Sequence, residues 1–236
     1  MIYAMIPARE GSERLKWKNL ALLDGKPLIS HVTETALKVG AFDQIIINSD
    51  SAVFSSIADS LGVNFYQRPK PLGASSALSD DVVADFFSAF PDCEYLFWIN
   101  PIAPLLSQSD IEHGLEILLN EADSVMAVTE KQVHANFRSD PINYDPTEKF
   151  AKTQDLVPIE LFCYSLMGWR RASFCSQYEA NEVGLLSGEF KTFCVSDHAG
   201  LIVKTAADLQ LIEAIMRSDN KSVQYHSLVN KLPTRE

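Results

Sequence analysis

The sequence predicts an α/β fold in which helices cover both faces of a mostly parallel central sheet. Short, continuously apolar runs alternate with amphipathic stretches through the first 130 residues, and strands that are buried on both faces have this composition. A length of 236 residues with 47% hydrophobic residues allows a sizeable core. The sequence contains no internal repeat. We therefore expect one domain over residues 1–217 and a C-terminal tail over residues 218–236.

The expected elements of the first half follow from apolar periodicity. Phe54, Ile57 and Leu61 lie at positions i, i+3 and i+7, which places them on one face of a helix. Ser107 and Asp110 are spaced as a capping box at the start of another helix. The expected strands are 2–6, 45–47, 63–66, 95–99 and 124–128, and the expected helices include residues 29–39, 54–61, 82–90 and 111–119.

The pattern changes after residue 129. The segment from there to about residue 170 is polar at first, has three prolines before residue 160 and shows no clear period, which predicts an irregular excursion from the sheet. A strand is expected within it at residues 161–169. The last expected element is a helix that opens at Thr205, where Asp208 completes the spacing of a second capping box.

The composition excludes several classes of function. Twenty basic against thirty-one acidic residues give a net charge of −11, which argues against a protein that mainly coats nucleic acid or anionic membrane. No apolar run reaches the roughly 20 residues of a membrane span. Residues 1–6 lack the basic start of a secretory signal, so we expect a cytoplasmic protein. The four cysteines show no CxxC spacing and are expected to be ordinary core thiols.

The loop after the first strand is the most informative segment. Within residues 9–19 four cations stand against two carboxylates, so the loop is locally positive in an acidic chain. A loop at the carboxyl end of a parallel strand borders the crevice in which open α/β sheets bind ligands, and Gly11 lets the backbone approach phosphate oxygens. We therefore expect an anionic ligand here, the alternative being a solvated basic loop. The charged residues are Arg9, Glu10, Glu13, Arg14, Lys16 and Lys18.

Residues Ile6-Pro7-Ala8-Arg9, Gly11-Ser12, Arg14 and Lys18-Asn19-Leu20 match the pattern I-P-A-R-x-G-S-K-R-x-P-x-K-N-L. This pattern opens the acylneuraminate cytidylyltransferases, the CMP-sialic acid synthetase-like family, and the chain resembles that family over most of residues 2–130. Later segments that extend the resemblance are Ile45-Ile-Ile-Asn-Ser-Asp50, Arg68-Pro69, Ser79 and Ile99-Asn-Pro-Ile-Ala-Pro-Leu105.

The resemblance implies a Rossmann-like nucleotidyltransferase domain that transfers CMP from CTP to an acidic, sialic acid-like sugar for surface polysaccharide biosynthesis, with release of pyrophosphate. Arg9 and Lys18 would be catalytic, and Asn100 would face the sugar acid. Mg²⁺ and a homodimer, in which the excursion completes the partner's sugar site, are further implications; no nucleic-acid or membrane partner is expected. The implied nucleotide-binding residues are Ala8, Arg9, Gly11, Ser12, Arg14, Lys18 and Asn19 around the phosphates, with Arg68 and Ser79 near the cytidine.

The sequence departs from the family where the family binds metal. In place of two aspartates in the pattern I-D-I-D-T-x-x-D-L, this chain has Ile202 and Lys204, so the metal ligands cannot be assigned. Asp208 is either a metal ligand or the capping partner of Thr205. Lys204 is either a surface lysine or an ammonium that itself neutralises phosphate charge. These departures leave an alternative function open, namely a catalytically impaired nucleotide- or sugar-binding relative with a regulatory or scaffolding role.

Two further positions concern the same crevice. Asp50 follows the second strand and either faces the ligand or caps the helix that begins near residue 51. Trp98 lies in an apolar strand with Tyr95 and Phe97, and we assign all three to the core rather than to a platform for base stacking.

Overall fold

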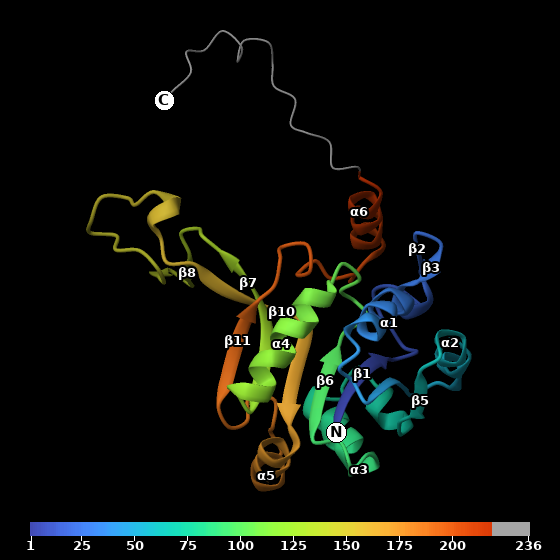
Figure 1. Cartoon of the computed structure of the whole chain (residues 1–236). Coiled ribbons are helices and arrows are strands. Elements are labelled where there is room, and N and C mark those ends of the chain that lie inside the picture. Colours follow the sequence, from blue (N-terminus) through green and yellow to red (C-terminus); the bar gives the residue numbers. More distant parts are fainter. Residues whose placement is uncertain (219–236) are drawn as a thin grey trace.

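The computed structural model describes residues 1–218 and is built on a seven-stranded sheet with the order β11-β7-β10-β6-β1-β4-β5 (Figure 1). All pairings are parallel except those of β10, which runs antiparallel to both β6 and β7. This confirms the expected α/β class. Residues 219–236 of the expected tail lie outside the described residues. The strands are β1 (Ile2–Ala8), β4 (Gln44–Ser49), β5 (Asn64–Gln67), β6 (Tyr95–Ile99), β7 (Ser124–Lys131), β10 (Ile159–Arg170) and β11 (Phe190–Cys194).

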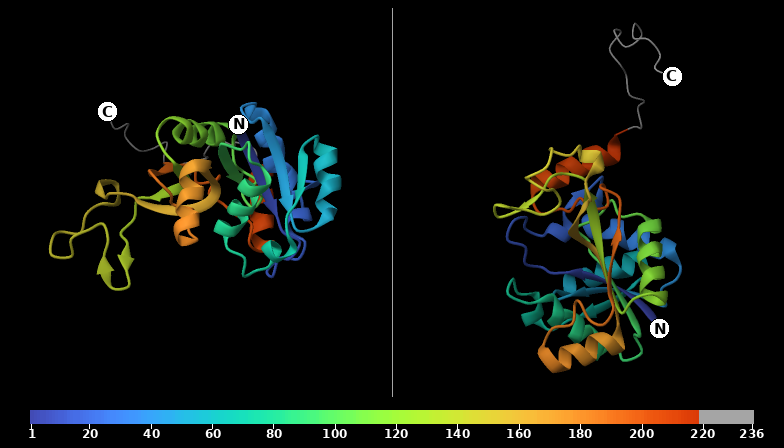
Figure 2. Two further views of the ribbon diagram at one scale, coloured as in Figure 1. Left: turned by 90° about the horizontal axis from the view of Figure 1, so that it is seen from below. Right: turned by 90° about the vertical axis from the view of Figure 1, so that its left-hand side faces the viewer.

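Helices cover both faces of this sheet, as expected (Figure 2). Successive side chains of a strand point to opposite faces, so Ile6 of β1 packs with α1, α2 and α4 while Met5 packs with α3 and α5. The result is two large apolar clusters with the sheet between them. The helices are α1 (Leu28–Val39), α2 (Ser55–Leu61), α3 (Ser79–Ala89), α4 (Gln108–Asn120), α5 (Arg171–Asn181) and α6 (Ala206–Arg217).

The region from α5 to β11 is one part of the described fold that the sequence analysis did not predict. Helix α5 has no apolar stripe from which it could be predicted, because Phe174 is its one buried residue. Tertiary contacts fix it instead: the Tyr178 hydroxyl donates a hydrogen bond to Asp81 of α3 at 2.7 Å, and the Gly184 amide donates one to Asp80 at 2.7 Å. Strand β11 is short and only partly buried, so it shows no strong pattern either.

Both expected capping boxes are confirmed. Ser107 and Asp110 exchange hydrogen bonds at the start of α4, and Thr205 and Asp208 do so at the start of α6. Helix α6 then packs its buried Ile212 into a third apolar cluster beside the hairpin of β2 (Leu22–Leu23) and β3 (Lys26–Pro27). This packing brings the segment before α6 next to the loop that follows β1.

The expected excursion projects from one end of the sheet (Figure 1). It runs from the end of β7 to the start of β10 and contains the short hairpin of β8 (Asn136–Phe137) and β9 (Asp140–Pro141). The strand expected at residues 161–169 is the greater part of β10, whose register against β7 shifts between Phe162 and Met167. Several large apolar side chains of the excursion are exposed, among them Phe137, Phe150 and Val157.

The cysteines divide between core and surface. Cys93 and Cys163 are buried, as expected, and Cys175 is partly so. The expectation of a core thiol is wrong for Cys194, which is exposed because it ends the edge strand β11. Within residues 1–218, no helix is long and apolar enough to cross a membrane.

Candidate functional site

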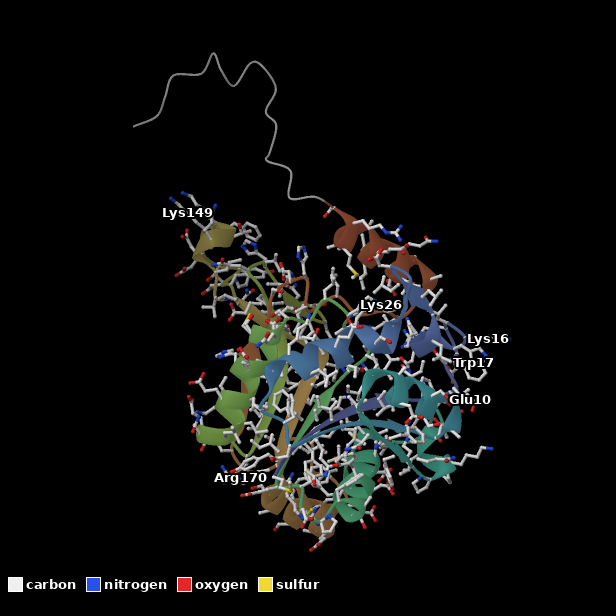
Figure 3. All side chains as sticks on the ribbon, turned by 45° about the vertical axis from the view of Figure 1, so that its right-hand side comes forward. Glu10, Lys16, Trp17, Lys26, Lys149 and Arg170 are labelled. Carbon is white, nitrogen blue, oxygen red and sulfur yellow. The ribbon has the colours of Figure 1, made fainter. Side chains whose placement is uncertain are left out.

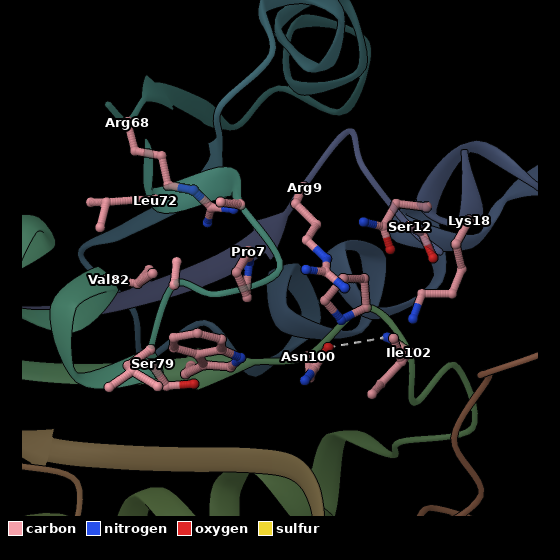
Figure 4. A pocket seen from close by; sticks show the side chains of 16 residues that line it. Pro7, Arg9, Ser12, Lys18, Arg68, Leu72, Ser79, Val82, Asn100 and Ile102 are labelled. Carbon is pink, nitrogen blue, oxygen red and sulfur yellow. Dashed lines mark hydrogen bonds between the residues drawn. The ribbon is translucent and has the colours of Figure 1, made fainter. Parts of the chain in front are cut away.

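A cavity of about 240 Å³ opens at the carboxyl ends of β1, β5 and β6 (Figure 4). Three segments form its wall: the loop after β1, the connection from β5 to α3, and residues 98–102 at the end of β6. The strands that lead into these segments lie near one another in the sheet, so residues far apart in sequence meet here. This is the edge of an open α/β sheet at which ligands bind.

The cavity brings together most of the residues expected from the sequence. The ones that line it are Arg9, Ser12, Lys18, Asn19, Arg68, Ser79 and Asn100. Ala8, Gly11 and Arg14 do not line it: Ala8 is buried at the end of β1, and the other two are exposed. From the same loop, Lys16 and Trp17 project outward at the surface (Figure 3).

Lys18 is the most perturbed cation of the cavity. Trp17 adopts a left-handed conformation with φ of 53°, which turns the chain inward so that Lys18 and Asn19 begin a short 3₁₀ helix. Burial first, and then the positive charges of Arg9, Arg14 and Lys204, lower the pKa of the Lys18 ammonium to about 8. An ammonium that is desolvated among like charges is a site for an anion.

Arg68 and Asp50 link the loop after β1 to the connection after β5. Arg68 is 5% exposed, donates a hydrogen bond to the Asn48 side-chain oxygen at 3.0 Å and lies 3.8 Å from an oxygen of Asp50. Asp50 also accepts a hydrogen bond from the Glu10 amide at 3.1 Å. Of the two alternatives for Asp50, the capping of the next helix is wrong, because no side chain caps the turn there and the Asp50 carboxylate accepts from the Glu10 amide instead.

Trp98 belongs to both the core and the cavity. It packs edge-on against Trp169 with ring centroids 6.3 Å apart, as its assignment to the core requires. It is 8% exposed, yet it lines the cavity, and its indole N–H has no hydrogen-bond partner within the described residues. Sequence reasoning missed this role, although strand alternation places Trp98 on the same face as Asn100.

Two more buried polar atoms of the cavity residues lack a partner within residues 1–218, the Asn19 side-chain oxygen and Arg68 Nε. A buried polar group without a hydrogen bond costs about 1–3 kcal/mol, a cost that a hydrogen bond to a bound ligand would offset. The cavity also has two ends of different character (Figure 4). Lys18 and Ser12 lie at one end, and Leu72 and Val82 lie at the other. A ligand with an anionic part and a less polar part fits this division.

The model of the cytidylyltransferase family matches residues 3–156. The chain belongs to the cytidylyltransferase family. It is 32% identical over 130 residues to the N-acylneuraminate cytidylyltransferase of Escherichia coli O18:K1:H7, with 54% of this chain and 31% of that protein covered. The CMP-N,N'-diacetyllegionaminic acid synthase of Legionella pneumophila is 28% identical over 167 residues, with 69% and 71% covered.

Solved structures of cytidylyltransferases share the fold. The CMP:2-keto-3-deoxy-manno-octonic acid synthetase in complex with CTP superposes with a TM-score of 0.68 at 20% identity, covering 91% of this chain and 98% of that one. At this identity the likeness concerns the fold alone. The chain spans 31% to 40% of the length of the N-acylneuraminate cytidylyltransferases of Escherichia coli and Streptococcus agalactiae that it matches.

The residues around the cavity do not fit the Mg²⁺ that the family resemblance implies. Within residues 1–218 the cavity wall has no carboxylate, and no group of three potential ligands gathers anywhere. Asp208 is the capping residue of α6, which confirms the structural alternative for it, and Asp50 is engaged by the Glu10 amide and Arg68. Mg²⁺ requires oxygen ligands, and it is usually held through one or two carboxylates that this site does not present.

Proposed function

We propose that this chain transfers CMP from CTP to an acidic sugar of the sialic acid class. The observation that supports the proposal is the cavity itself, in a chain of the cytidylyltransferase family. Lys18 and Ser12 lie at one end of the cavity, and Leu72 and Val82 lie with Arg68 and Ser79 at the other (Figure 4). The triphosphate would contact Arg9, Ser12, Lys18 and Asn19, with Gly11, Ala8 and Arg14 in the supporting loop. The cytidine would lie toward Arg68 and Ser79, and the sugar acid toward Asn100.

The reaction is a displacement at the α-phosphorus of CTP. The anomeric hydroxyl oxygen of the sugar forms a bond to this phosphorus, the bond from the phosphorus to the bridging oxygen of the β-phosphate breaks, and pyrophosphate leaves with that electron pair. The hydroxyl proton passes to solvent. Arg9 and Lys18 stabilise the charge that develops on the leaving group, because preorganised cations in a partly desolvated site act strongly on it.

The test is to incubate the protein with CTP and acidic nonulosonic sugars and to measure pyrophosphate and the CMP-sugar. Arg9→Ala is expected to lower the rate by about 10²-fold, the magnitude typical of a lost charge-stabilising group. Lys16→Ala is the matched control, since Lys16 is a cation of the same loop that does not line the cavity. Folded wild-type protein that forms no CMP-sugar from any acidic sugar would refute the proposal.

A homodimer is part of the proposal. Phe150 is 75% exposed and Phe137 is 67% exposed, and both lie on the projecting excursion together with Val157. Large exposed apolar side chains on a projecting segment are typical of an interface. Light scattering on the eluting protein is expected to give a dimer, and the double variant Phe137→Ser with Phe150→Ser to give a monomer. A wild-type monomer at all concentrations would contradict this part of the proposal.

The proposal also includes a cellular location and a use for the product. All four cysteines are unpaired, which favours a reducing compartment, so the proposed site of action is the cytoplasm and the proposed use of the product is surface polysaccharide biosynthesis. The relatives reported above are named as cytidylyltransferases or synthases. The alternative of an impaired binding protein therefore gains no support from the comparisons.

A further inference from the structure

The charged groups around Lys18 come from two distant parts of the chain. Arg9 and Arg14 belong to the loop after β1, whereas Lys204 belongs to the segment before α6, and the charge of each acts on Lys18. The Val203 amide donates a hydrogen bond to the carbonyl of Ile102 at 2.8 Å, and Ile102 lines the cavity. The backbone at Lys204 is thereby fixed beside the cavity wall.

Two carboxylates of this region, Asp208 and Asp50, already accept hydrogen bonds from the chain. One oxygen of Asp208 accepts hydrogen bonds from the Lys204 amide at 2.9 Å, the Thr205 amide at 2.7 Å and the Thr205 hydroxyl at 3.0 Å. One oxygen of Asp50 accepts from the Glu10 amide. A metal bound through these oxygens would displace donors that organise α6 and the loop after β1. The hydrogen bonds of these two carboxylates therefore indicate a structural role for them rather than metal binding.

We propose that the site binds a triphosphate with the ammonium groups of Lys18 and Lys204 in the role of a divalent cation, so that binding requires no Mg²⁺. This inference takes the identity of the nucleotide, CTP, from the proposed function. Its own claim is that the side chains of the site supply the positive charge that Mg²⁺ would otherwise supply.

The charge balance agrees with this inference. A fully ionised nucleoside triphosphate carries roughly four negative charges, about one on each phosphate and one more on the terminal group. Lys18, Arg9, Arg14 and Lys204 supply four positive charges, and Asp208 is the carboxylate among the described residues whose charge acts on Lys18, so that three of these positive charges remain uncompensated. A triphosphate that already carries Mg²⁺ would bring two positive charges into this cluster. The free triphosphate is therefore the better match.

Calorimetric titration tests the inference without any turnover. CTP and, separately, inorganic triphosphate are titrated into the full chain in EDTA and again in excess Mg²⁺. We expect both ligands to bind in EDTA, and Mg²⁺ to leave the affinity unchanged or to weaken it. Lys204→Ala is expected to weaken binding in EDTA about fivefold, the value of one exposed ion pair of about 1 kcal/mol. Lys16→Ala, the exposed cation of the same loop, is the control and should bind like wild type.

A second variant reverses the expected metal dependence. Ile202→Asp with Lys204→Asp places two carboxylates beside the cavity and removes one cation. Its binding of CTP is expected to require Mg²⁺, and thermal unfolding with Lys204→Met as a neutral companion checks that each variant folds.

The outcomes separate this inference from the proposed function. CTP binding by wild type that requires Mg²⁺, no binding in either buffer, or an unchanged affinity in Lys204→Ala overturns the inference. CTP binding that requires Mg²⁺, together with transfer to an acidic sugar, would overturn the inference while leaving the proposed function intact. Metal-free binding of CTP without transfer to any acidic sugar would support the inference and refute the proposed function.

Discussion

Raising the pH from 7 to 9 should release CTP from the cavity because Lys18 loses its proton. The pKa of free Lys18 is about 8, so its protonated fraction falls from about 0.9 to about 0.1 across this interval. A bound triphosphate raises that pKa, since it places negative charge beside the ammonium. Affinity is therefore fully present below pH 8 and falls above it. The loss between pH 7 and pH 9 is about tenfold, or roughly 1.4 kcal/mol.

Calorimetry of CTP in a series of buffers measures this slope. Other groups around Lys18 change little over the interval: arginine side chains remain charged, and the terminal phosphate of the ligand is already ionised above pH 7.5 or so. Lys18→Arg is the control, because a guanidinium keeps its charge and should flatten the curve. Equal slopes for wild type and Lys18→Arg, or a flat curve for wild type, would show that Lys18 does not hold the phosphates.

Three further predictions follow from individual contacts. Lys18→Met should abolish tight CTP binding yet stabilise the free protein by roughly 0.5–1 kcal/mol in chemical unfolding, because it removes a partly buried charge among like charges; a less stable variant would contradict this. Trp98→Phe keeps an aromatic ring in the core but deletes the unpartnered N–H, so CTP affinity should fall about fivefold with no loss of stability; unchanged affinity would remove Trp98 from the site. Gly73→Ala would place a methyl group 2.2 Å from Asp50 Cγ, and thermal unfolding should show a loss of about 1–3 kcal/mol together with weaker CTP binding; wild-type behaviour would mean that Asp50 can move freely.

The fold was predictable where the information is local. Strands β1, β4 and β6 are apolar runs whose burial can be inferred without knowing their neighbours in space, and the two capping boxes are four-residue patterns. The loop after β1 was predictable for the same reason, since a strand end, Gly11 and a run of cations stand together in sequence. Arg68, Ser79 and Asn100 came from the family resemblance, and the structure places them around the same cavity as Arg9.

The remainder depends on contacts between distant segments. The residues next to Asp50 in the sequence do not show that its carboxylate accepts a hydrogen bond from the Glu10 amide instead of capping a helix. The donor lies forty residues away in the chain. The apolar residues beside Trp98 in the sequence predict a core position. Trp98 lines the cavity because the connection after β5 packs next to it in the fold. Helix α5 is fixed by bonds to Asp80 and Asp81 rather than by its own apolar stripe. Long-range contacts override local preference in each case.

The placement of cations, rather than their sum, determines what an acidic chain can bind. A net charge of −11 opposes the approach of any large polyanion, but in physiological salt charges more than about 8 Å apart are largely screened. Within the partly desolvated cavity, a cation 4 Å from a phosphate contributes up to roughly 4 kcal/mol of attraction. A nucleotide that enters the cavity would meet Arg9 and Lys18, which line it, whereas an extended nucleic acid would meet the net negative charge of the whole chain. We therefore expect the excess of acidic residues to disfavour an extended polyanion, while the local cations still attract a small anion.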